Sequence, residues 1–327
     1  MIISRTPLRM SFVGGGSDLP AFYRRFPGAV VSTAINKYVY ITVNKKFDDR
    51  IRVSYSRTEE ARSVAKIKHP LVREALRKLN LEGGIEITSI ADIPSKGSGL
   101  GSSSSFIVGL LHALYAYQCQ YRSAEQLARE SCEIEIERCG EPIGKQDQYA
   151  AAFGGFNFIQ FYPDDSVSLE PILCKPETLQ ELQKNILIFY TGITRSASTI
   201  LKHKQETIAA EKSTQRVLRR MVKLAHQLKA ELQNNNLQAF GEIIHENWLL
   251  KKSITNQISS SQIDDWYAKA RRHGAIGGKL LGAGTGGFLM FYSPQEHHEA
   301  ITKALADLRR IAVNFEPQGS KIIFVHN

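Results

Sequence analysis

The sequence predicts an α+β fold divided into two domains. With 327 residues, the chain has the length of two domains of ordinary size. Both halves contain β-branched and aromatic runs typical of strands, and both contain apolar residues at helical spacing. Long helices dominate from residue 196 onward, and we place the boundary near Lys184. We therefore expect an amino-terminal domain over residues 1–184 and a carboxy-terminal domain over residues 185–327.

The amino-terminal half begins with strands joined by turns. Residues 30–35 and 38–43 are rich in β-branched and aromatic side chains, and residues 52–55 alternate between polar and apolar. Ser123 followed by Gln126 has the pattern of a capping box and predicts a helix start. The other elements expected here are helices at 69–79, 103–117 and 123–138, and strands at 85–90 and 156–161.

The carboxy-terminal half is expected to be mainly helical. Leu218, Met221, Ala225, Leu228 and Leu232 step by three and four residues, which predicts an amphipathic helix. The basic residues between them lack interleaved aromatic residues, so they indicate a solvated helix face rather than a nucleic-acid contact; they are Arg216, Arg219, Arg220 and Lys223. The other expected elements are strands at 185–190, 288–292 and 321–325, and a helix at 294–310.

Composition and charge limit the class of protein. The 43% hydrophobic and 23% charged residues are ordinary for a globular chain. The longest apolar stretch, residues 106–117, is too short to span a bilayer, and no secretion signal is expected at the start. Four cysteines without a Cys-x-x-Cys pair predict neither a zinc site nor disulfides, which favours the cytoplasm. The net charge of +10 fits an anionic partner: a nucleotide, sugar phosphate, nucleic acid or acidic membrane.

Seventeen of the 24 glycines fall into four short segments, at 14–16, 97–101, 140–155 and 274–287. Glycine in such clusters has an entropic cost, so it indicates tight turns or a close approach of the backbone to another group. Four clusters with different flanking sequences favour ligand-binding loops. The last cluster, Gly282 to Gly287, matches a dinucleotide-binding pattern only weakly, because a strand-like run follows where a helix is required.

One glycine cluster has the features of a phosphate-binding loop. It follows a predicted strand and opens an apolar helix, whose amino terminus offers unpaired amides and partial positive charge. Its glycines let the backbone wrap an anion, and its serines are expected to cap the helix or reach a hydrated Mg²⁺. We predict that nucleotide phosphates are bound by Lys96, Gly97, Ser98, Gly99, Leu100, Gly101, Ser102, Ser103 and Ser104.

Three motifs in this order resemble those of the GHMP kinases, the superfamily of galactokinase, homoserine kinase and mevalonate kinase. They are Pro7-Leu8-Arg9 with Gly14–Asp18, then Pro94–Ser104, then Lys279–Gly287. A closer resemblance is to the D-glycero-D-manno-heptose 7-phosphate kinases, in the segments 12–20, 101–106 and 146–155. The resemblance covers essentially the whole chain. It implies a two-domain fold in which ATP and the acceptor meet in the cleft between the domains.

The resemblance also implies roles for individual residues. Asp147 matches the catalytic base, and Arg9 matches the cation near the reacting hydroxyl. Ser103 and Glu135 match the residues that hold Mg²⁺, and Asp18 matches the aspartate that grips sugar hydroxyls. Because a phosphate dianion calls for a cation within reach, its candidate ligands are Lys37, Lys145 and Arg195. The full set of expected acceptor-binding residues is Gly15, Gly16, Ser17, Asp18, Lys37, Gly144, Lys145, Arg195 and Gly284.

The expected function is therefore that of an ATP- and Mg²⁺-dependent kinase that phosphorylates C1 of a heptose 7-phosphate. An anomeric kinase for an unphosphorylated sugar, such as fucose or galactose, is the alternative within this class. From another class, the basic charge leaves open a non-catalytic nucleotide or nucleic-acid binder. The leading interpretation expects no nucleic-acid or membrane partner and leaves room for a homodimer.

Overall fold

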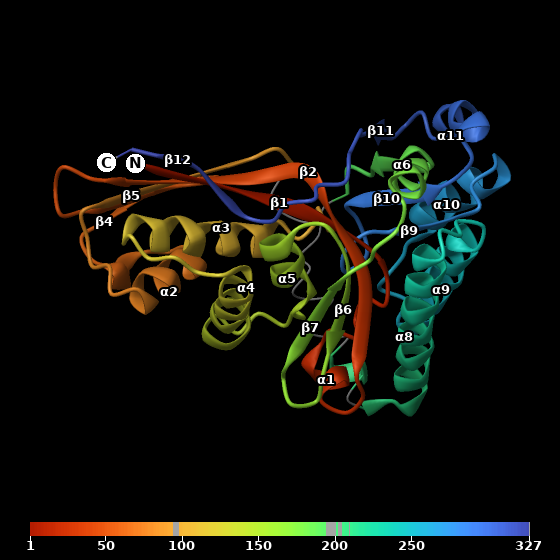
Figure 1. Ribbon diagram of the computed structural model, residues 1–327, viewed down its shortest axis with the longest axis horizontal. Helices are drawn as coiled ribbons and strands as arrows, with labels where there is room; N and C mark the ends of the chain where they lie inside the picture. Colours follow the sequence, from red (N-terminus) through yellow and green to blue (C-terminus); the bar gives the residue numbers. More distant parts are fainter. Residues whose placement is uncertain (94–97, 194–200, 202–204, 209, 327) are drawn as a thin grey trace.

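The computed structural model describes residues 1–93, 98–193, 201, 205–208 and 210–326. Its helices and strands build two units that lie one beyond the other along the molecule (Figure 1). Each unit has a mainly antiparallel sheet packed against helices, so the predicted α+β class is confirmed. Lys96, Gly97 and Arg195, which the sequence assigned to ligand binding, lie outside the described residues.

The first sheet is built around two long strands, β1 (Ile2–Val13) and β2 (Gly28–Lys45). One edge of β2 pairs with β1, whereas its other edge pairs with two different strands along its length. The sheet runs in the order β12 (Lys321–Val325), β1, β2, β5 (Ile85–Ala91), β3 (Ile51–Ser54), β4 (Thr58–Ala61). A branch of the sheet is formed by β6 (Phe156–Phe161), which pairs with β2 on one side and with β7 (Val167–Pro171) on the other.

The two runs predicted as separate strands, 30–35 and 38–43, belong to the single strand β2. The pairing with β1 shifts register between Pro7 and Leu8, which face Tyr38 and Ile35 respectively. Such an irregularity bends a strand locally and hides its continuity from a sequence pattern. The bend directs the amino-terminal part of β2 toward the second unit of the molecule (Figure 1).

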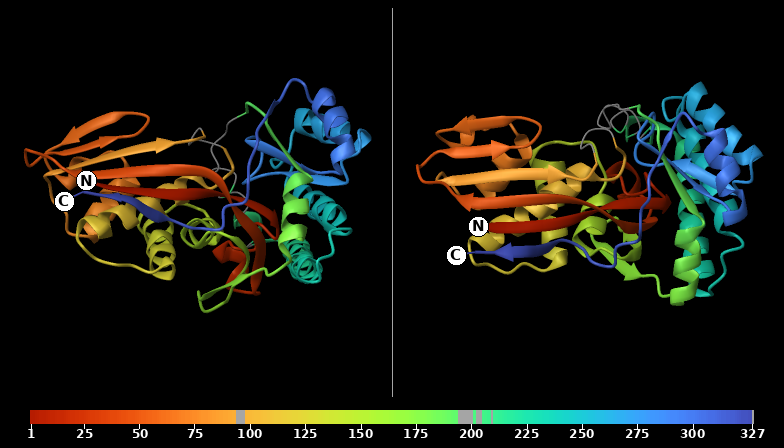
Figure 2. Two further views of the ribbon diagram at one scale, coloured as in Figure 1. Left: turned by 45° about the horizontal axis from the view of Figure 1, so that its top comes forward. Right: turned by 90° about the horizontal axis from the view of Figure 1, so that it is seen from above.

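Helices cover one face of the first sheet (Figure 2). The central helix, α3 (Ser102–Tyr117), is buried over most of its length against β1 and β2. Ser123 and Gln126 form the predicted capping box of the next helix. The remaining helices of this unit are α1 (Pro20–Tyr23), the 3₁₀ turn Val64–Lys66, α2 (Pro70–Lys78), α4 (Ala124–Cys132) and α5 (Gln146–Phe153). The next helix, α6 (Pro176–Lys184), lies with the elements of the second unit, where the Thr178 hydroxyl donates to the side chain of Asn235 (Figure 1).

The helix predicted over 123–138 has that extent but not one geometry. Its last six residues, Glu133–Arg138, form a π-helical turn in which the amide of Cys139 donates to the carbonyl of Ile134. Turns of this kind are rare and often occur at functional sites. The turn here carries Glu135, for which the family resemblance implied a role as a metal ligand.

The second unit contains a smaller sheet in the order β11 (Arg309–Arg310), β8 (Ile186–Tyr190), β10 (Phe288–Tyr292), β9 (Gly277–Leu280). Its helices are α8 (Lys212–Gln233), α9 (Phe240–Ile254), α10 (Ser261–Arg272), the 3₁₀ turn Gln295–His297 and α11 (His298–Ala304). The predicted apolar stripe of α8 is fully buried, and its four basic residues are exposed as expected.

The carboxy-terminal part differs from the prediction in the extent of one helix and in the sheet to which the last strand belongs. The helix predicted over 294–310 is wrong in extent, because the chain turns after Ala304 and Arg309–Arg310 pair with β8 instead. Leu305 and Leu308 are still buried, so their spacing mimicked a longer helix. The last strand, β12, returns to the first sheet and pairs with β1. In the described part of the chain, no helix has both the length and the apolar character needed to cross a membrane.

Candidate active site

Arg9 and Asp147 form an ion pair where β1 meets the first turn of α5. Nε and Nη2 of Arg9 donate to the two carboxylate oxygens of Asp147 at 2.7 and 2.6 Å, a bidentate geometry. Nη1 of Arg9 donates to the carbonyl of Gly99 at 2.7 Å. The Arg9 side chain is almost fully buried, whereas that of Asp147 is 22% exposed. The pair therefore leaves part of the carboxylate available to a ligand.

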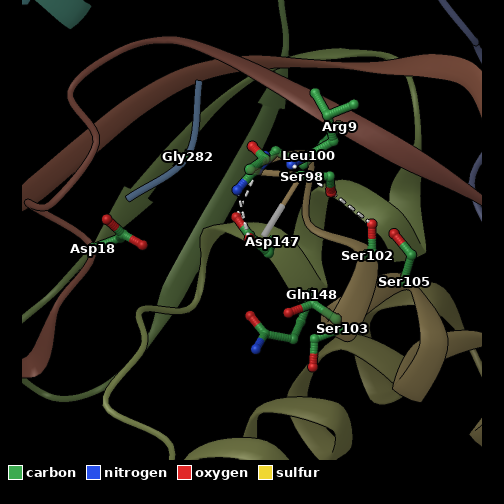
Figure 3. A network of polar contacts seen from close by, with 12 residues as sticks. Arg9, Asp18, Ser98, Leu100, Ser102, Ser103, Ser105, Asp147, Gln148 and Gly282 are labelled. Carbon is green, nitrogen blue, oxygen red and sulfur yellow. Dashed lines mark hydrogen bonds and ion pairs between the residues drawn. The ribbon is translucent and has the colours of Figure 1, made fainter. Parts of the chain in front are cut away.

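The loop before α3 is fixed against this ion pair (Figure 3). The amide of Arg9 donates to the carbonyl of Leu100 at 3.0 Å. Gly99 and Gly101 have φ of +73° and +77°, a region that side chains disfavour. A methyl group at Gly101 would lie 3.3 Å from Oδ2 of Asp147, so the loop backbone passes directly beside the predicted base.

The serines after the loop do not cap α3, so that expectation was wrong. The N-cap residue is Gly101, and no side chain makes a capping bond to the helix. Each serine hydroxyl has another partner: Ser102 lies 3.0 Å from the Ser98 hydroxyl, Ser103 and Ser104 donate to Glu135, and Ser105 donates to the Pro7 carbonyl. Without a side-chain cap, the amino end of α3 keeps the donors that suit an anion.

Glu135 lies in a buried cluster beside this helix end. Besides the bonds from Ser103 and Ser104, its carboxylate accepts one from Nε2 of Gln148 at 2.7 Å. Burial raises the pKa of Glu135 to about 7, and the nearby charge of Asp147 acts in the same direction. The three hydrogen bonds oppose this rise in pKa. The carboxyl is thus held in place, but its charge lacks a compensating cation among the described residues.

The loop that carries Gly14 to Asp18 is anchored by its own side chains. Ser17 is fully buried, and its hydroxyl donates to the carbonyls of Gly14 and Ala29, so it supports the loop. Asp18 accepts a bond from the amide of Gly16 at 2.8 Å. A methyl group at Gly144 would lie 1.9 Å from the Asp18 carboxylate, so the two segments are in contact. Asp18 lies apart from the serines of α3 (Figure 3).

Of the three cations predicted for a distal phosphate, Lys37 and Lys145 are among the described residues. Lys145 donates to the carbonyl and carboxylate of Asp165 at 2.8 and 3.2 Å, and its ammonium lies over the ring of Tyr23. Lys37 is half-buried and lies where the pairing of β2 with β1 shifts register.

Gly284, which was also predicted to bind the acceptor, packs against Ile258. A methyl group at Gly284 would lie 2.9 Å from the Ile258 carbonyl oxygen.

Two buried lysines that had no predicted role hold the segment of β9 and Gly282 in place, one against β1 and the other against α9. Nζ of Lys279, on β9, donates to the carbonyls of Ser11 and Phe12 on β1 at 2.7 and 3.0 Å. Nζ of Lys251, on α9, donates to the carbonyl of Gly282 at 2.5 Å. Lys279 stands in the third sequence motif, which was a usable signal. Lys251 stands in an ordinary helical segment, which gave none.

Comparison with known proteins places the whole chain among sugar and related kinases. Residues 65–155 match the family model described as GHMP kinases N terminal domain, and residues 228–310 match GHMP kinases C terminal. D-glycero-alpha-D-manno-heptose 7-phosphate kinase of Campylobacter jejuni is 31% identical over 319 residues, which cover 93% of both chains. A bifunctional fucokinase/GDP-fucose pyrophosphorylase of Arabidopsis thaliana is 27% identical over 86% of this chain and 29% of its own length.

Solved structures share the entire fold. The crystal structure of a D-glycero-D-manno-heptose 1-phosphate kinase from Bacteroides thetaiotaomicron superimposes with a TM-score of 0.82 at 26% identity, covering 100% of both chains. Galactokinase of Lactococcus lactis, solved with galactose, gives a TM-score of 0.77 at 16% identity over 98% of this chain and 94% of its own. The predicted two-domain arrangement is thereby confirmed.

Proposed function

The chain belongs to the GHMP kinases, and from this premise we propose that it transfers the γ-phosphoryl group of ATP to the C1 hydroxyl of D-glycero-D-manno-heptose 7-phosphate, giving the 1,7-bisphosphate. The observation that carries the proposal is the position of Asp147. Its partly exposed carboxylate is held by Arg9 beside the glycine backbone of the loop before α3. A base and a phosphate-binding loop in contact are what a kinase requires.

Phosphoryl transfer depends mainly on positioning and on neutralising the charge of the transferred group. Asp147 accepts the proton of the attacking hydroxyl, which contributes typically 10²–10⁴-fold to such reactions. Arg9 orients that carboxylate with two hydrogen bonds and places a positive charge beside the oxygen that becomes negative. An anomeric hydroxyl is more acidic than an ordinary alcohol, so a carboxylate base suffices.

The nucleotide phosphates are proposed to bind to the loop amides and to the amino end of α3. Ser103 and Glu135 fit a Mg²⁺ site, because this ion takes one or two protein oxygens and completes its shell with water and phosphate. When bound, Mg²⁺ neutralises phosphate charge; Glu135 and Ser103 fix where it does so.

The acceptor is the part of the proposal that rests on the relatives. The Campylobacter jejuni relative is named for a heptose 7-phosphate, whereas the Bacteroides thetaiotaomicron structure is named for a heptose 1-phosphate. We favour the 7-phosphate because the relative named for it is 31% identical over 93% of both chains. The fucokinase match, at 27% identity, supports an anomeric kinase of an unphosphorylated sugar as the second candidate.

One assay tests the proposal and separates these candidates. The protein is incubated with ATP, Mg²⁺ and one of several acceptors: unphosphorylated fucose, unphosphorylated galactose, or a heptose phosphate. The products are then resolved by phosphorus NMR. A new anomeric phosphate beside an intact 7-phosphate is the expected result. Turnover confined to fucose or galactose would establish the second candidate. No turnover with any sugar, together with DNA binding that weakens steeply with salt, would indicate a non-catalytic binder.

A further inference from the structure

The first turn of α5 carries three polar side chains in succession, Gln146, Asp147 and Gln148, and one of them has an unpaired buried oxygen atom. Successive helix residues point about 100° apart, so the three side chains face different directions. Asp147 binds Arg9, and Gln148 binds Glu135. Gln146 binds neither; its Oε1 is shielded from solvent and has no hydrogen-bond partner within the described residues. An unpaired buried polar atom costs about 1–3 kcal/mol, so this side chain is poorly placed for stability alone.

A second unpaired atom lies close to it. Ser11 is buried on β1, and its hydroxyl also lacks a partner in the described part of the chain. A methyl group at Gly15 would lie 3.8 Å from Nε2 of Gln146 and 3.9 Å from Oγ of Ser11, so both side chains approach the same point. Ser11 stands two residues after Arg9 on the same strand, and alternate strand residues share a face. The point therefore lies on the face of β1 that carries Arg9, and Gln146 directly precedes Asp147 in the chain.

We infer that Gln146 and Ser11 form a subsite for the acceptor hydroxyl adjacent to the one that is phosphorylated. The inference rests on the proposed function; for a C1 acceptor this hydroxyl is the one on C2. An amide oxygen accepts a hydrogen bond from a sugar hydroxyl, and a serine hydroxyl donates one to it. The terminal torsion of glutamine is broad, so Oε1 turns toward a ligand at little cost.

Gly15 has a defined part in this subsite. Its φ is not positive, and a methyl group there would make only ordinary contacts, so alanine is tolerated by the backbone. That methyl group would nevertheless occupy the space between Gln146 and Ser11. Gly15→Ala should raise the KM for the acceptor about three- to tenfold, the equivalent of one hydrogen bond, and leave the KM for ATP unchanged.

The decisive experiment compares heptose 7-phosphate with its 2-deoxy analogue as substrates of the full chain. The wild type should prefer the substrate that has the C2 hydroxyl. Gln146→Leu and Ser11→Ala should each reduce that preference in kcat/KM about three- to tenfold. Gln180→Leu, at an exposed position of α6, is the matched control and should keep the wild-type preference.

The outcomes separate this inference from the proposed function. If both sugar phosphates are substrates and the preference is unchanged in Gln146→Leu, Ser11→Ala and Gly15→Ala, the subsite is refuted while the kinase assignment stands. If the wild type phosphorylates neither sugar phosphate, the proposed function and the subsite both fail. A preference that collapses in the variants but not in Gln180→Leu supports both.

Discussion

Glu135 offers a test of the site that needs neither substrate nor metal. Its carboxyl is 1% exposed and is held by Ser103, Ser104 and Gln148. Because burial raises its pKa from 4.5 to about 7, the folded protein keeps this proton over a range in which the unfolded chain has released it. The free energy of unfolding should therefore fall as pH rises between these two values. Below pH 4.5 the stabilisation is fully present, and above pH 7 it is lost.

The size of this effect follows from the shift. Each pKa unit corresponds to 1.36 kcal/mol, so the rise to about 7 corresponds to about 3 kcal/mol in total. Glu135→Gln keeps the shape of the side chain but cannot ionise. Relative to this variant, the wild type should lose about 2–3 kcal/mol of stability between pH 5 and pH 8.

Urea unfolding in the presence of EDTA measures the difference at each pH. Glu82→Gln, at an exposed loop position, is the matched control and should follow the wild-type curve. A wild-type curve that stays parallel to that of Glu135→Gln from pH 5 to pH 8 would refute the reasoning. It would mean that the carboxyl is ionised throughout, with its charge already balanced by the folded protein.

Three further predictions concern the residues around the loop before α3. Asp147→Asn should bind ATP normally but lower kcat at least a hundredfold; steady-state kinetics with near-normal turnover would exclude its role as base. Gly99→Ala should lose at least about 1–2 kcal/mol, because its φ is +73° and the methyl group would lie 2.5 Å from the Leu281 carbonyl; urea unfolding checks this loss. Lys279→Met should lose about 2–3 kcal/mol by the same measurement, since it removes charge-assisted bonds to two carbonyls of β1, whereas Lys184→Met at an exposed position should not.

Local signals in the sequence were sufficient for most elements near the site. The glycine-serine run predicted a loop that opens a helix, and α3 begins one residue before the expected start. The same signal failed for the serine hydroxyls. Capping is the usual local use of a serine at a helix start, but Ser103 and Ser104 are drawn to Glu135, which is more than 30 residues away in the chain. A buried carboxylate competes for these donors, and only the fold brings it there.

Long-range pairing explains the other differences. β12 was predicted as a strand, yet no local pattern could assign it to the first sheet, because its partner β1 lies at the opposite end of the sequence. The role of Lys251 could not be predicted from the sequence, since a buried lysine that binds a carbonyl looks the same in the sequence as an exposed one; Lys279 at least stands in the third motif. The family resemblance implied that Arg9 and Asp147 both act at the reacting hydroxyl, and the structure adds that they form a bidentate ion pair.

The contacts of the third motif indicate that its glycines serve packing. A methyl group at Gly282 would lie 2.3 Å from Cα of Gly99, so the two loops touch backbone to backbone. Lys251 holds the carbonyl of Gly282 on one side, and Lys279 fastens the same segment to β1 on the other. Arg9, on β1, in turn binds the carbonyl of Gly99. Three segments from distant parts of the chain thus form a closed ring of contacts, so Gly282→Ala should displace the loop at Gly99. If the proposed phosphate site lies at that loop, the variant should have a higher KM for ATP in steady-state kinetics, and an unchanged KM would contradict the argument.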